Sequence, residues 1–429
     1  MVWGTGLTGI ATYREMIKKG HEVRLVDEDI PVPQSKEADI PVKMVEAEDM
    51  KWADMVIPSP GIPRGHPIFK YARKVSSEIE VASQLLTGKL IAVTGTNGKT
   101  TTVTLIYKIL DAAGFDVAQG GNISPPLIAL VERDPLVVVA EVSSFQLEWI
   151  EKFNPDIAVC MNITPDHLDR YIDMEEYVAQ KLRIFENQES DGFAIINDSD
   201  TYLAGIRTKA KLAGFAPNKG KRRYGAYIKD GRIRFYGEIE GPGPLVEYAL
   251  PLGNGVIEDM MGSALVTRLM GVDIPVMEDV FKKFKGIPHR MTLVTEIGGI
   301  RFIDDSKATN VGAVEKALSG IPGRVILILG GKDKGGDFSA VVSQYKTKIK
   351  KAILIGQASK RIEREISCFV DVEYAPNMQQ AVRLAYLDAL PGEIVLLSPG
   401  CASFDMFESY AQRGEVFIRC VKDLIVNKN

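Results

Sequence analysis

The chain has 429 residues, of which 45% are hydrophobic and 25% are charged, and its formal net charge is −4. This length exceeds one ordinary hydrophobic core, so two to four domains are expected, and the slightly acidic balance argues against non-specific nucleic-acid binding. No apolar run approaches a membrane span and the first residues lack a signal-peptide layout, so a cytoplasmic location is expected. The cysteines form no CxxC pair, which is typical of reduced thiols: Cys160, Cys368, Cys401 and Cys420.

The first segment, residues 1–88, indicates a nucleotide-binding βαβ unit. Gly4 to Gly9 form a GxGxxG pattern, and a helix-like run to Lys19 follows it. A predicted strand over 21–27 then ends in an acid, Asp27. Such a unit places a nucleotide at the loop after its first strand. The alternative is a small α/β domain without a ligand, because a GxGxxG pattern alone is a weak signal.

Residues 90–102, LIAVTGTNGKTTT, predict a phosphate-binding loop between a buried strand and a helix. Gly95 and Gly98 allow backbone N–H groups to point inward. Lys99 can reach terminal phosphates, the Thr100 hydroxyl can ligate Mg²⁺, and the helix N-terminus adds partial positive charge. The alternative is a plain strand-to-helix turn that ends in Gly-Lys-Thr.

Further polar residues follow predicted strands in the second segment, residues 89–288. Glu141 ends a buried-type strand, and an acid there in a phosphate-loop protein commonly holds Mg²⁺. His167 follows the next strand among acidic residues, so a metal or substrate role and a plain surface position are equally open. The turn at Asn122 could bring an amide to the same cleft. Lys181 lies on a helix-like run, where a lysine is usually solvated.

The third segment, residues 289–429, predicts a second doubly wound α/β domain. Its apolar runs are separated by helical stretches and end in polar loops: 301–303, 325–329, 352–355 and 394–397. Lys307, Lys334 and Ser403 are therefore expected on one rim, which suits an anionic ligand. Cys401 lies in such a loop, but no paired histidine is evident near it, so a structural role is favoured over a nucleophilic one.

Taken together, these motifs resemble the Mur ligase family, and more narrowly its D-glutamate-adding branch. They cover nearly the whole chain in the family's order: residues 94–101, 120–122, 141–147, 166–171, 181–183, 288–290, 305–310 and 398–405. The resemblance implies three α/β domains: a Rossmann-like N-terminal domain for a UDP-sugar (1–88), a central P-loop domain for ATP (89–288) and a C-terminal Rossmann-like domain for an amino acid (289–429).

The resemblance implies an ATP-dependent amide ligase of peptidoglycan synthesis. The carboxylate of UDP-MurNAc-L-alanine would attack the γ-phosphate of ATP, and the amine of D-glutamate would attack the resulting acyl phosphate. Two anions meet in the first step, so the site needs cations, and the family uses two Mg²⁺ ions. The expected partners are these small molecules, without nucleic acid or a membrane span, and the enzyme is expected to be a monomer.

The resemblance also implies catalytic and metal-binding roles. Lys99 would contact the β- and γ-phosphates, while Thr100 and Glu141 would share the first Mg²⁺. His167 would ligate the second Mg²⁺. Lys181 would be carbamylated by CO₂, because an ammonium group between two divalent ions is repelled whereas a carbamate is an anionic ligand.

Binding residues are implied for each substrate. For ATP they are Gly95, Thr96, Asn97, Gly98, Lys99, Thr100, Thr101, Arg290, Asp305 and Lys307. For the UDP substrate they are Leu7, Thr8, Asp27, Ser59, Asn122 and His167. For D-glutamate they are Thr309, Lys334, Ser403, Phe404 and Tyr410. The chain departs from the family pattern near the adenine and uracil positions, at Glu258, Asp259, Gly262 and Asp29.

Two kinds of alternative function stay open. Another Mur ligase or a folylpolyglutamate synthase-like amide ligase shares several motifs, but a pteridine substrate does not need the UDP-type first domain. A non-catalytic nucleotide-binding regulatory protein would bind ATP without turnover. The intact set of Lys99, Glu141, His167 and Lys181 argues against that reading, because binding alone does not require a second metal site.

Overall fold

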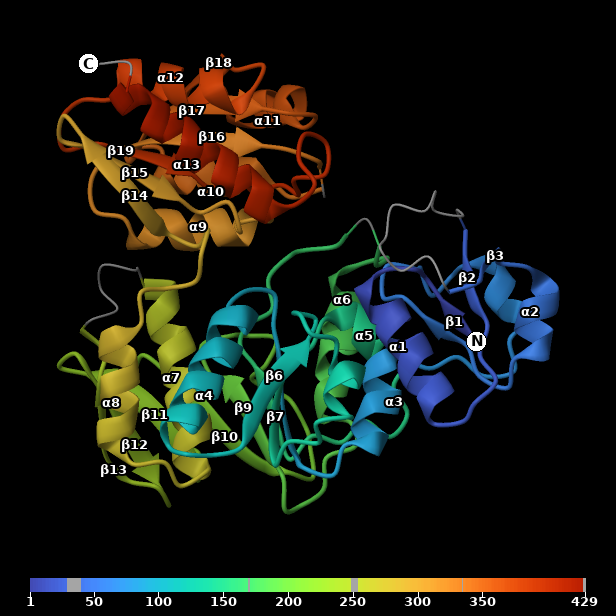
Figure 1. Cartoon of the computed structure of the whole chain (residues 1–429). Helices are drawn as coiled ribbons and strands as arrows, with labels where there is room; N and C mark the ends of the chain where they lie inside the picture. Colours follow the sequence, from blue (N-terminus) through green and yellow to red (C-terminus); the bar gives the residue numbers. More distant parts are fainter. Residues whose placement is uncertain (29–39, 169, 248–253, 334, 427–429) are drawn as a thin grey trace. The chain divides into compact units, whose positions relative to one another are not determined.

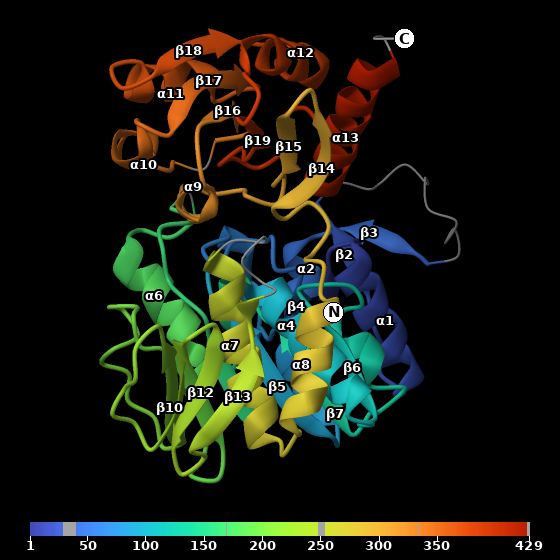
Figure 2. The same ribbon diagram turned by 90° about the vertical axis from the view of Figure 1, so that its left-hand side faces the viewer.

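The computed structural model describes residues 1–28, 40–168, 170–247, 254–333 and 335–426. It is an α/β protein with three sheets of four, nine and six strands, and helices flank them (Figures 1 and 2). One sheet falls in each of the three predicted segments, while the domain boundaries themselves stay predictions. No helix among the described residues is long and apolar enough to cross a membrane. The chain forms two compact units: 1–163, 175–245 and 259–281 in the first, and 164–174, 246–258 and 282–429 in the second.

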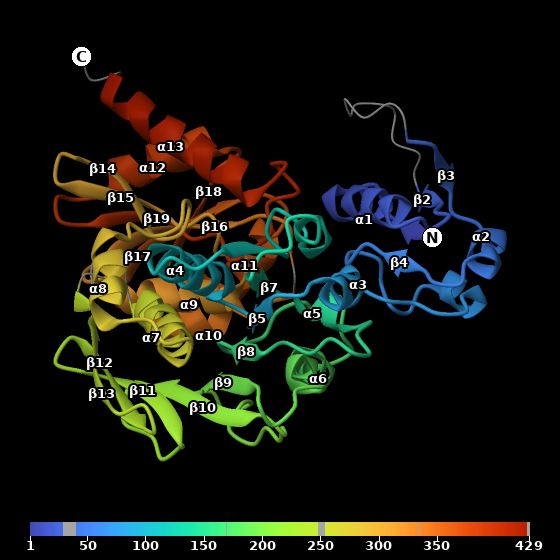
Figure 3. The same cartoon turned by 60° about the horizontal axis from the view of Figure 1, so that its bottom comes forward.

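The N-terminal sheet is parallel, with strand order β3-β2-β1-β4, and helices cover both of its faces (Figure 3). The elements are β1 (Val2–Trp3), α1 (Leu7–Lys18), β2 (Leu25–Asp27), β3 (Val42–Met44), α2 (Ala47–Trp52), β4 (Ile57–Pro58), η1 (Pro67–Tyr71) and α3 (Glu78–Leu85). Trp3 packs with Val26 and Met50, whereas Val2 lies against Gly9 of α1. A Cβ atom on Gly9 would collide with the carbonyl oxygen of Gly4, which explains the GxGxxG spacing.

The central sheet has nine strands in the order β13-β12-β11-β10-β9-β8-β5-β7-β6. Its elements are β5 (Lys89–Thr94), α4 (Lys99–Ala112), β6 (Val117–Gly121), η2 (Leu127–Leu130), β7 (Val137–Glu141), α5 (Ser144–Leu147), β8 (Ile157–Cys160), α6 (Met174–Leu182), η3 (Arg183–Phe185), β9 (Phe193–Asn197), β10 (Lys211–Ala216), β11 (Tyr224–Lys229), β12 (Arg232–Gly237), β13 (Gly241–Leu245), α7 (Asn254–Leu269) and α8 (Ile274–Lys283). The strand before the phosphate loop, β5, is paired in parallel with β7 and β8. The polar residues that follow these three strands therefore meet at one edge of the sheet.

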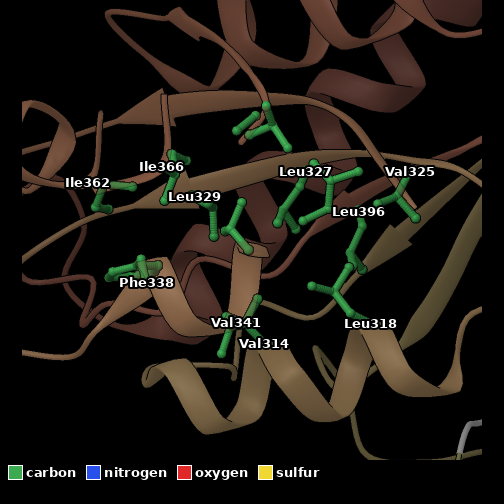
Figure 4. Close-up of a cluster of buried hydrophobic side chains, with 14 of the residues drawn as sticks. Val314, Leu318, Val325, Leu327, Leu329, Phe338, Val341, Ile362, Ile366 and Leu396 are labelled. Atoms are coloured by element: carbon green, nitrogen blue, oxygen red, sulfur yellow. The ribbon is translucent and has the colours of Figure 1, made fainter. Parts of the chain in front are cut away.

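The C-terminal sheet has the order β14-β15-β19-β16-β17-β18, and only the pair β14–β15 is antiparallel among its described pairings. Its elements are β14 (Thr292–Ile297), β15 (Ile300–Asp304), α9 (Val311–Gly320), β16 (Val325–Gly330), α10 (Phe338–Tyr345), β17 (Ile349–Ile355), α11 (Ser359–Ile366), β18 (Asp371–Tyr374), α12 (Met378–Asp388), β19 (Ile394–Leu397) and α13 (Tyr410–Val426). Alternate strand residues face opposite sides. Leu327 and Leu329 meet α9, α10 and α11 (Figure 4), and Ile326 and Ile328 meet α12 and α13.

Candidate active site

The predicted phosphate loop joins β5 to α4, and two of its glycines have backbone angles that other residues rarely adopt. The φ angles are +145° at Gly95 and +89° at Gly98. Gly98 is also the N-cap of α4, so no N-cap side chain covers the first backbone N–H groups of the helix. These N–H groups, together with the helix dipole, form a site for phosphate oxygens.

Asn162, which follows β8, fixes the shape of this loop. Its side chain accepts a hydrogen bond from Asn97 N (2.8 Å) and donates one to Asn97 O (3.0 Å), and its backbone oxygen accepts one from Thr96 N (2.8 Å). Asn162 is 5% exposed. Asn162 was not predicted as a site residue, because the strand predicted from the sequence ran over 157–163 and included it, whereas the observed β8 ends at Cys160. On the other side of the loop, the buried Asp259 carboxylate lies against Gly98.

Two predicted site residues donate hydrogen bonds to the carboxylate of a third, Glu141, which is buried at the end of β7. Thr100 Oγ1 donates to Glu141 Oε2 (2.7 Å) and Asn122 Nδ2 donates to Glu141 Oε1 (2.8 Å). Lys99 Nζ lies over the phosphate loop itself and donates to the carbonyl oxygens of Gly95 (2.7 Å) and Thr96 (2.8 Å). The fold therefore brings Thr100 and Asn122 to Glu141, while the Lys99 ammonium group lies on the phosphate loop.

The oxygen atoms of this cluster fit a Mg²⁺ ion bound together with phosphates. Mg²⁺ prefers oxygen ligands and usually takes one or two carboxylates while water and substrate phosphates complete its shell. Thr100 and Glu141 supply one hydroxyl and one carboxylate in direct contact. The described residues contain no group of three or more His, Cys, Asp or Glu side chains that could hold a metal alone.

Lys181 is 2% exposed, so the expectation of a solvated lysine, drawn from its local sequence, is wrong. Its helix, α6, turns this side chain toward the phosphate loop, where Nζ donates to Gly95 O (3.0 Å) and lies 4.8 Å from the centre of the Tyr177 ring. Lys99 contacts the same carbonyl oxygen. Two ammonium groups on one buried oxygen repel each other, and converting one of them into an anion would remove this repulsion.

His167 belongs to the second compact unit, where its segment packs against the start of α9. Its φ angle is +56°, and its backbone N–H donates to Asp166 Oδ1 (2.9 Å). Asp166 Oδ2 accepts a hydrogen bond from Asn310 Nδ2 (3.0 Å), and Asn310 is the N-cap of α9. The Asp-His pair is therefore held in a defined backbone geometry. The neighbouring Asp169 lies outside the described residues.

Two further predicted ATP ligands, Asp305 and Lys307, lie in the loop after β15. Burial raises the pKa of Asp305 to about 7, although a hydrogen bond from Ser398 Oγ (2.8 Å) and the charge of Arg290 oppose this shift. Lys307 Nζ donates to the Tyr410 hydroxyl (3.2 Å) and lies 4.5 Å from the centre of that ring. The predicted ATP ligand Lys307 and the predicted amino-acid ligand Tyr410 are therefore in direct contact.

The remaining predicted amino-acid ligands lie on neighbouring loops. Gly400 N donates to Ala308 O (2.9 Å), so the segments that carry Ser403 and Thr309 run side by side. Ser403 is buried, whereas Phe404 is 69% exposed. Lys334 lies outside the described residues.

Arg413 is a fully buried residue of this region that the sequence analysis missed. Its guanidinium donates to Ser306 Oγ (3.0 Å), Ser306 O (2.8 Å) and Cys401 O (3.1 Å). It therefore ties the loop after β15 to the loop after β19. A single arginine on a helical run carries no local signal of such a role. Burial raises the pKa of the Cys401 thiol to about 12, which supports the structural reading of that cysteine.

Four of the predicted UDP ligands lie at the loop after β1: Leu7, Thr8, Asp27 and Ser59. Asp27 Oδ2 accepts hydrogen bonds from Thr5 N (2.8 Å) and Thr5 Oγ1 (2.6 Å). The Ser59 side chain lies against Gly4, where a Cβ atom would overlap it. Leu7 and Thr8 form the first turn of α1, with Leu7 exposed. Asp29 lies outside the described residues.

Of the positions that depart from the family pattern, two have contacts that explain their residue types. Glu258 forms an ion pair with Lys316 (2.8 Å). Gly262 lies close to the side chain of Met161, so a larger residue would need that side chain to shift.

Comparisons with known proteins agree along the whole chain. The Mur ligase middle domain matches residues 93–232, and the Mur ligase, glutamate ligase domain matches residues 289–401. The UDP-N-acetylmuramoylalanine--D-glutamate ligase of Geobacter metallireducens is 41% identical over 440 residues, which cover 99% of this chain and 97% of the relative. The protein of the same name from Acidobacterium capsulatum is 39% identical, with 99% and 95% covered.

A solved structure with the same fold is the pseudomurein peptide ligase type C from Methanothermus fervidus. Its TM-score is 0.64 with 17% sequence identity, and the match covers 99% of both chains. At this identity the likeness concerns the fold alone.

Proposed function

Because this chain belongs to the Mur ligase family, we propose that it is the ATP-dependent ligase that adds D-glutamate to UDP-N-acetylmuramoyl-L-alanine during peptidoglycan synthesis. The full-length identity to relatives that carry this name supports the substrate assignment. The observation that carries the chemistry is the phosphate loop, with Thr100 on Glu141 and two lysines on Gly95. A binding protein without turnover has no need of this concentration of charge.

The phosphate loop binds and orients ATP in this mechanism. The N–H groups at the start of α4 hold phosphate oxygens, and Lys99 exchanges the carbonyl oxygens of Gly95 and Thr96 for the β- and γ-phosphates. This exchange is favourable because an ammonium group bonds more strongly to an anion than to neutral carbonyls. The loop's backbone also accounts for the other proposed ATP contacts, which involve Asn97, Gly98 and Thr101.

Two Mg²⁺ sites complete the charge balance. Thr100 and Glu141 would hold the first ion, and His167 and carbamylated Lys181 are the proposed ligands of the second. When bound, Mg²⁺ would supply positive charge to offset the repulsion between the substrate carboxylate and the γ-phosphate. The burial of Lys181 beside Gly95 favours its conversion to a carbamate, because the modification replaces one of two crowded ammonium groups by an anion.

The other proposed contacts bind the three substrates: ATP, D-glutamate and the UDP substrate. Asp305 binds the ribose, and Arg290 and Lys307 bind the ATP phosphates. D-Glutamate is held by Thr309, Lys334, Ser403, Phe404 and Tyr410. The UDP substrate is held by Leu7, Thr8, Asp27, Ser59, Asn122 and His167. We further propose that the enzyme acts in the cytoplasm and that it is a monomer.

The test is phosphate release from ATP in the presence of Mg²⁺, bicarbonate and UDP-MurNAc-L-alanine. D-Glutamate, L-glutamate, L-lysine and diaminopimelate are compared in parallel, and release is expected only with D-glutamate. Lys99→Ala is the negative control: it should lose release but still bind the UDP substrate, because the two sites use different residues. Release with another amino acid would overturn the substrate assignment, and release with none would favour a regulatory nucleotide-binding protein.

A further inference from the structure

Arg183 lies two residues after Lys181 and makes contacts that the proposed mechanism does not use. Its Nη1 donates to Leu147 O (2.7 Å) and Glu148 O (2.8 Å), and its Nη2 donates to Ile150 O (2.7 Å). The remaining nitrogen, Nε, donates to Glu186 Oε2 (2.8 Å). All three guanidinium nitrogens therefore have a partner.

The three carbonyl groups lie at the end of the short helix α5. The last carbonyl groups of a helix have no partner within the helix and need one from elsewhere. The N-terminus of α5 is closed by a capping box between Ser143 and Gln146. Arg183 closes the other end, because a planar guanidinium can bond several carbonyl groups at once in a fixed geometry.

The same helical segment is thereby held on two sides. Lys181 lies in the last turn of α6, and Arg183 is the first residue of the adjoining 3-10 helix η3. Lys181 donates to Gly95, which follows β5, and Arg183 donates to residues that follow β7. Strands β5 and β7 are neighbours, with Val93 paired to Glu141. The segment is thus tied to both loops that carry the phosphate and metal groups.

Carbamylation changes the contact of Lys181 with Gly95 but leaves the contacts of Arg183 unchanged. A carbamate replaces the ammonium group of Lys181 by an anion with a single N–H, so the charge-assisted bond to Gly95 is lost. The contacts of Arg183 with Leu147, Glu148 and Ile150 involve no group that reacts. They are the contacts that can hold the helix in place after the modification.

We propose that Arg183 is a positioning residue that holds the C-terminal end of α6, through the adjoining η3, against the end of α5 and so keeps the carbamylated Lys181 beside the phosphate loop. The proposal rests on the proposed function, because it concerns the carbamate of that mechanism. It assigns Arg183 no contact with a substrate. Its effect is on the geometry and occupancy of the carbamate.

The experiment compares Arg183→Gln and Arg183→Lys with the parent enzyme and with Arg207→Gln. Arg207 is an exposed arginine of the same compact unit, and its side chain has no ion pair among the described residues. Carbamate is measured by ¹³C NMR after addition of ¹³C-bicarbonate, with Lys181→Ala to assign the signal. Phosphate-release kinetics and thermal unfolding are measured on the same samples.

Arg183→Gln is expected to lose most of the carbamate signal and about 100-fold in kcat, since displacing a reacting group by about 1 Å can cost this much. KM for the UDP substrate should stay unchanged. Arg183→Lys keeps the charge without the planar fork and should fall between Arg183→Gln and the parent. If Arg183→Gln does not fold, the milder Glu186→Gln and Arg183→Lys should still show the partial loss.

A purely structural role predicts another pattern, namely a lower unfolding temperature with an unchanged carbamate signal and kcat per folded molecule. That pattern, or a parent enzyme without a carbamate signal, would overturn the proposal. An equal loss in Arg207→Gln would also overturn it. A parent enzyme that has the signal but no D-glutamate-dependent phosphate release would instead count against the proposed function, while loss of the signal in Arg183→Gln would still support the positioning role.

Discussion

Arg413 is buried and connects two loops of the C-terminal domain. Its replacement by methionine tests how much these contacts contribute to the stability of the protein. The variant removes the guanidinium and keeps an apolar stem of similar length. Burial lowers the pKa of Arg413 to about 10, so the group is still cationic at neutral pH. Three carbonyl oxygens, on Ser306, Cys401 and Ala402, would lose their charged donor at once.

The expected cost follows from these contacts. Arg413 makes four hydrogen bonds, including one to Ser306 Oγ, and each contributes about 1 kcal/mol net. A buried acceptor that loses its donor generally costs about 1–3 kcal/mol, so the loss at three carbonyl groups is consistent with a sum of about 4 kcal/mol. For a domain of this size, each kcal/mol lowers the unfolding temperature by about 2–4 °C. Arg413→Met should therefore unfold about 8–16 °C below the parent.

Scanning calorimetry or circular dichroism on the full chain measures this shift. The matched control is Arg364→Met, since Arg364 is an exposed arginine of the same domain and should change the unfolding temperature by no more than about 2 °C. Arg413→Lys keeps the charge without the planar fork and should lose about half as much as Arg413→Met. KM for D-glutamate should rise in both Arg413 variants, because the tied loops flank Ser403 and Lys307. An Arg413→Met protein that unfolds within 2 °C of the parent would refute this account of the site.

Three other substitutions test the remaining features. Lys181→Ala should be inactive in phosphate release and partly rescued by short carboxylic acids, because the lost group is an anion; rescue by amines would contradict the carbamate. Gly98→Ala should lose ATP turnover, since its φ angle is +89° and its Cβ would collide with the Asp259 carboxylate; a normal rate would contradict the loop geometry. Burial raises the pKa of Glu78 from 4.5 to about 7, so ionising Glu78 costs more in the folded protein than in the unfolded chain. As pH rises from 4.5 to above 7, the free energy of unfolding of the parent should therefore fall by about 3 kcal/mol relative to that of Glu78→Gln. Urea unfolding at both pH values measures this difference, and a difference that does not change with pH would contradict the pKa shift.

Local sequence patterns were sufficient to predict α/β segments, the phosphate loop and the polar residues at the ends of the strands. Short apolar runs predict buried parallel strands, and polar residues that follow them meet at one sheet edge. Thr100 and Glu141, which the family resemblance assigned to one Mg²⁺, are in contact in the structure because β5 and β7 are neighbours. The predicted strand over 21–27 was longer than the observed β2, since its first residues lack a neighbouring strand in the described structure.

The burial of Lys181 and the roles of Asn162, Arg183 and Arg413 emerge from the folded chain. Lys181 meets Gly95 across 86 positions of sequence, Asn162 meets Asn97 across 65, and Arg413 meets Ser306 across 107. A lysine or arginine on an amphipathic helix has the same local pattern whether it faces water or a carbonyl group. Its energy depends on desolvation and on hydrogen-bond partners that only the packing of distant segments supplies, and no spacing within one helix encodes those partners.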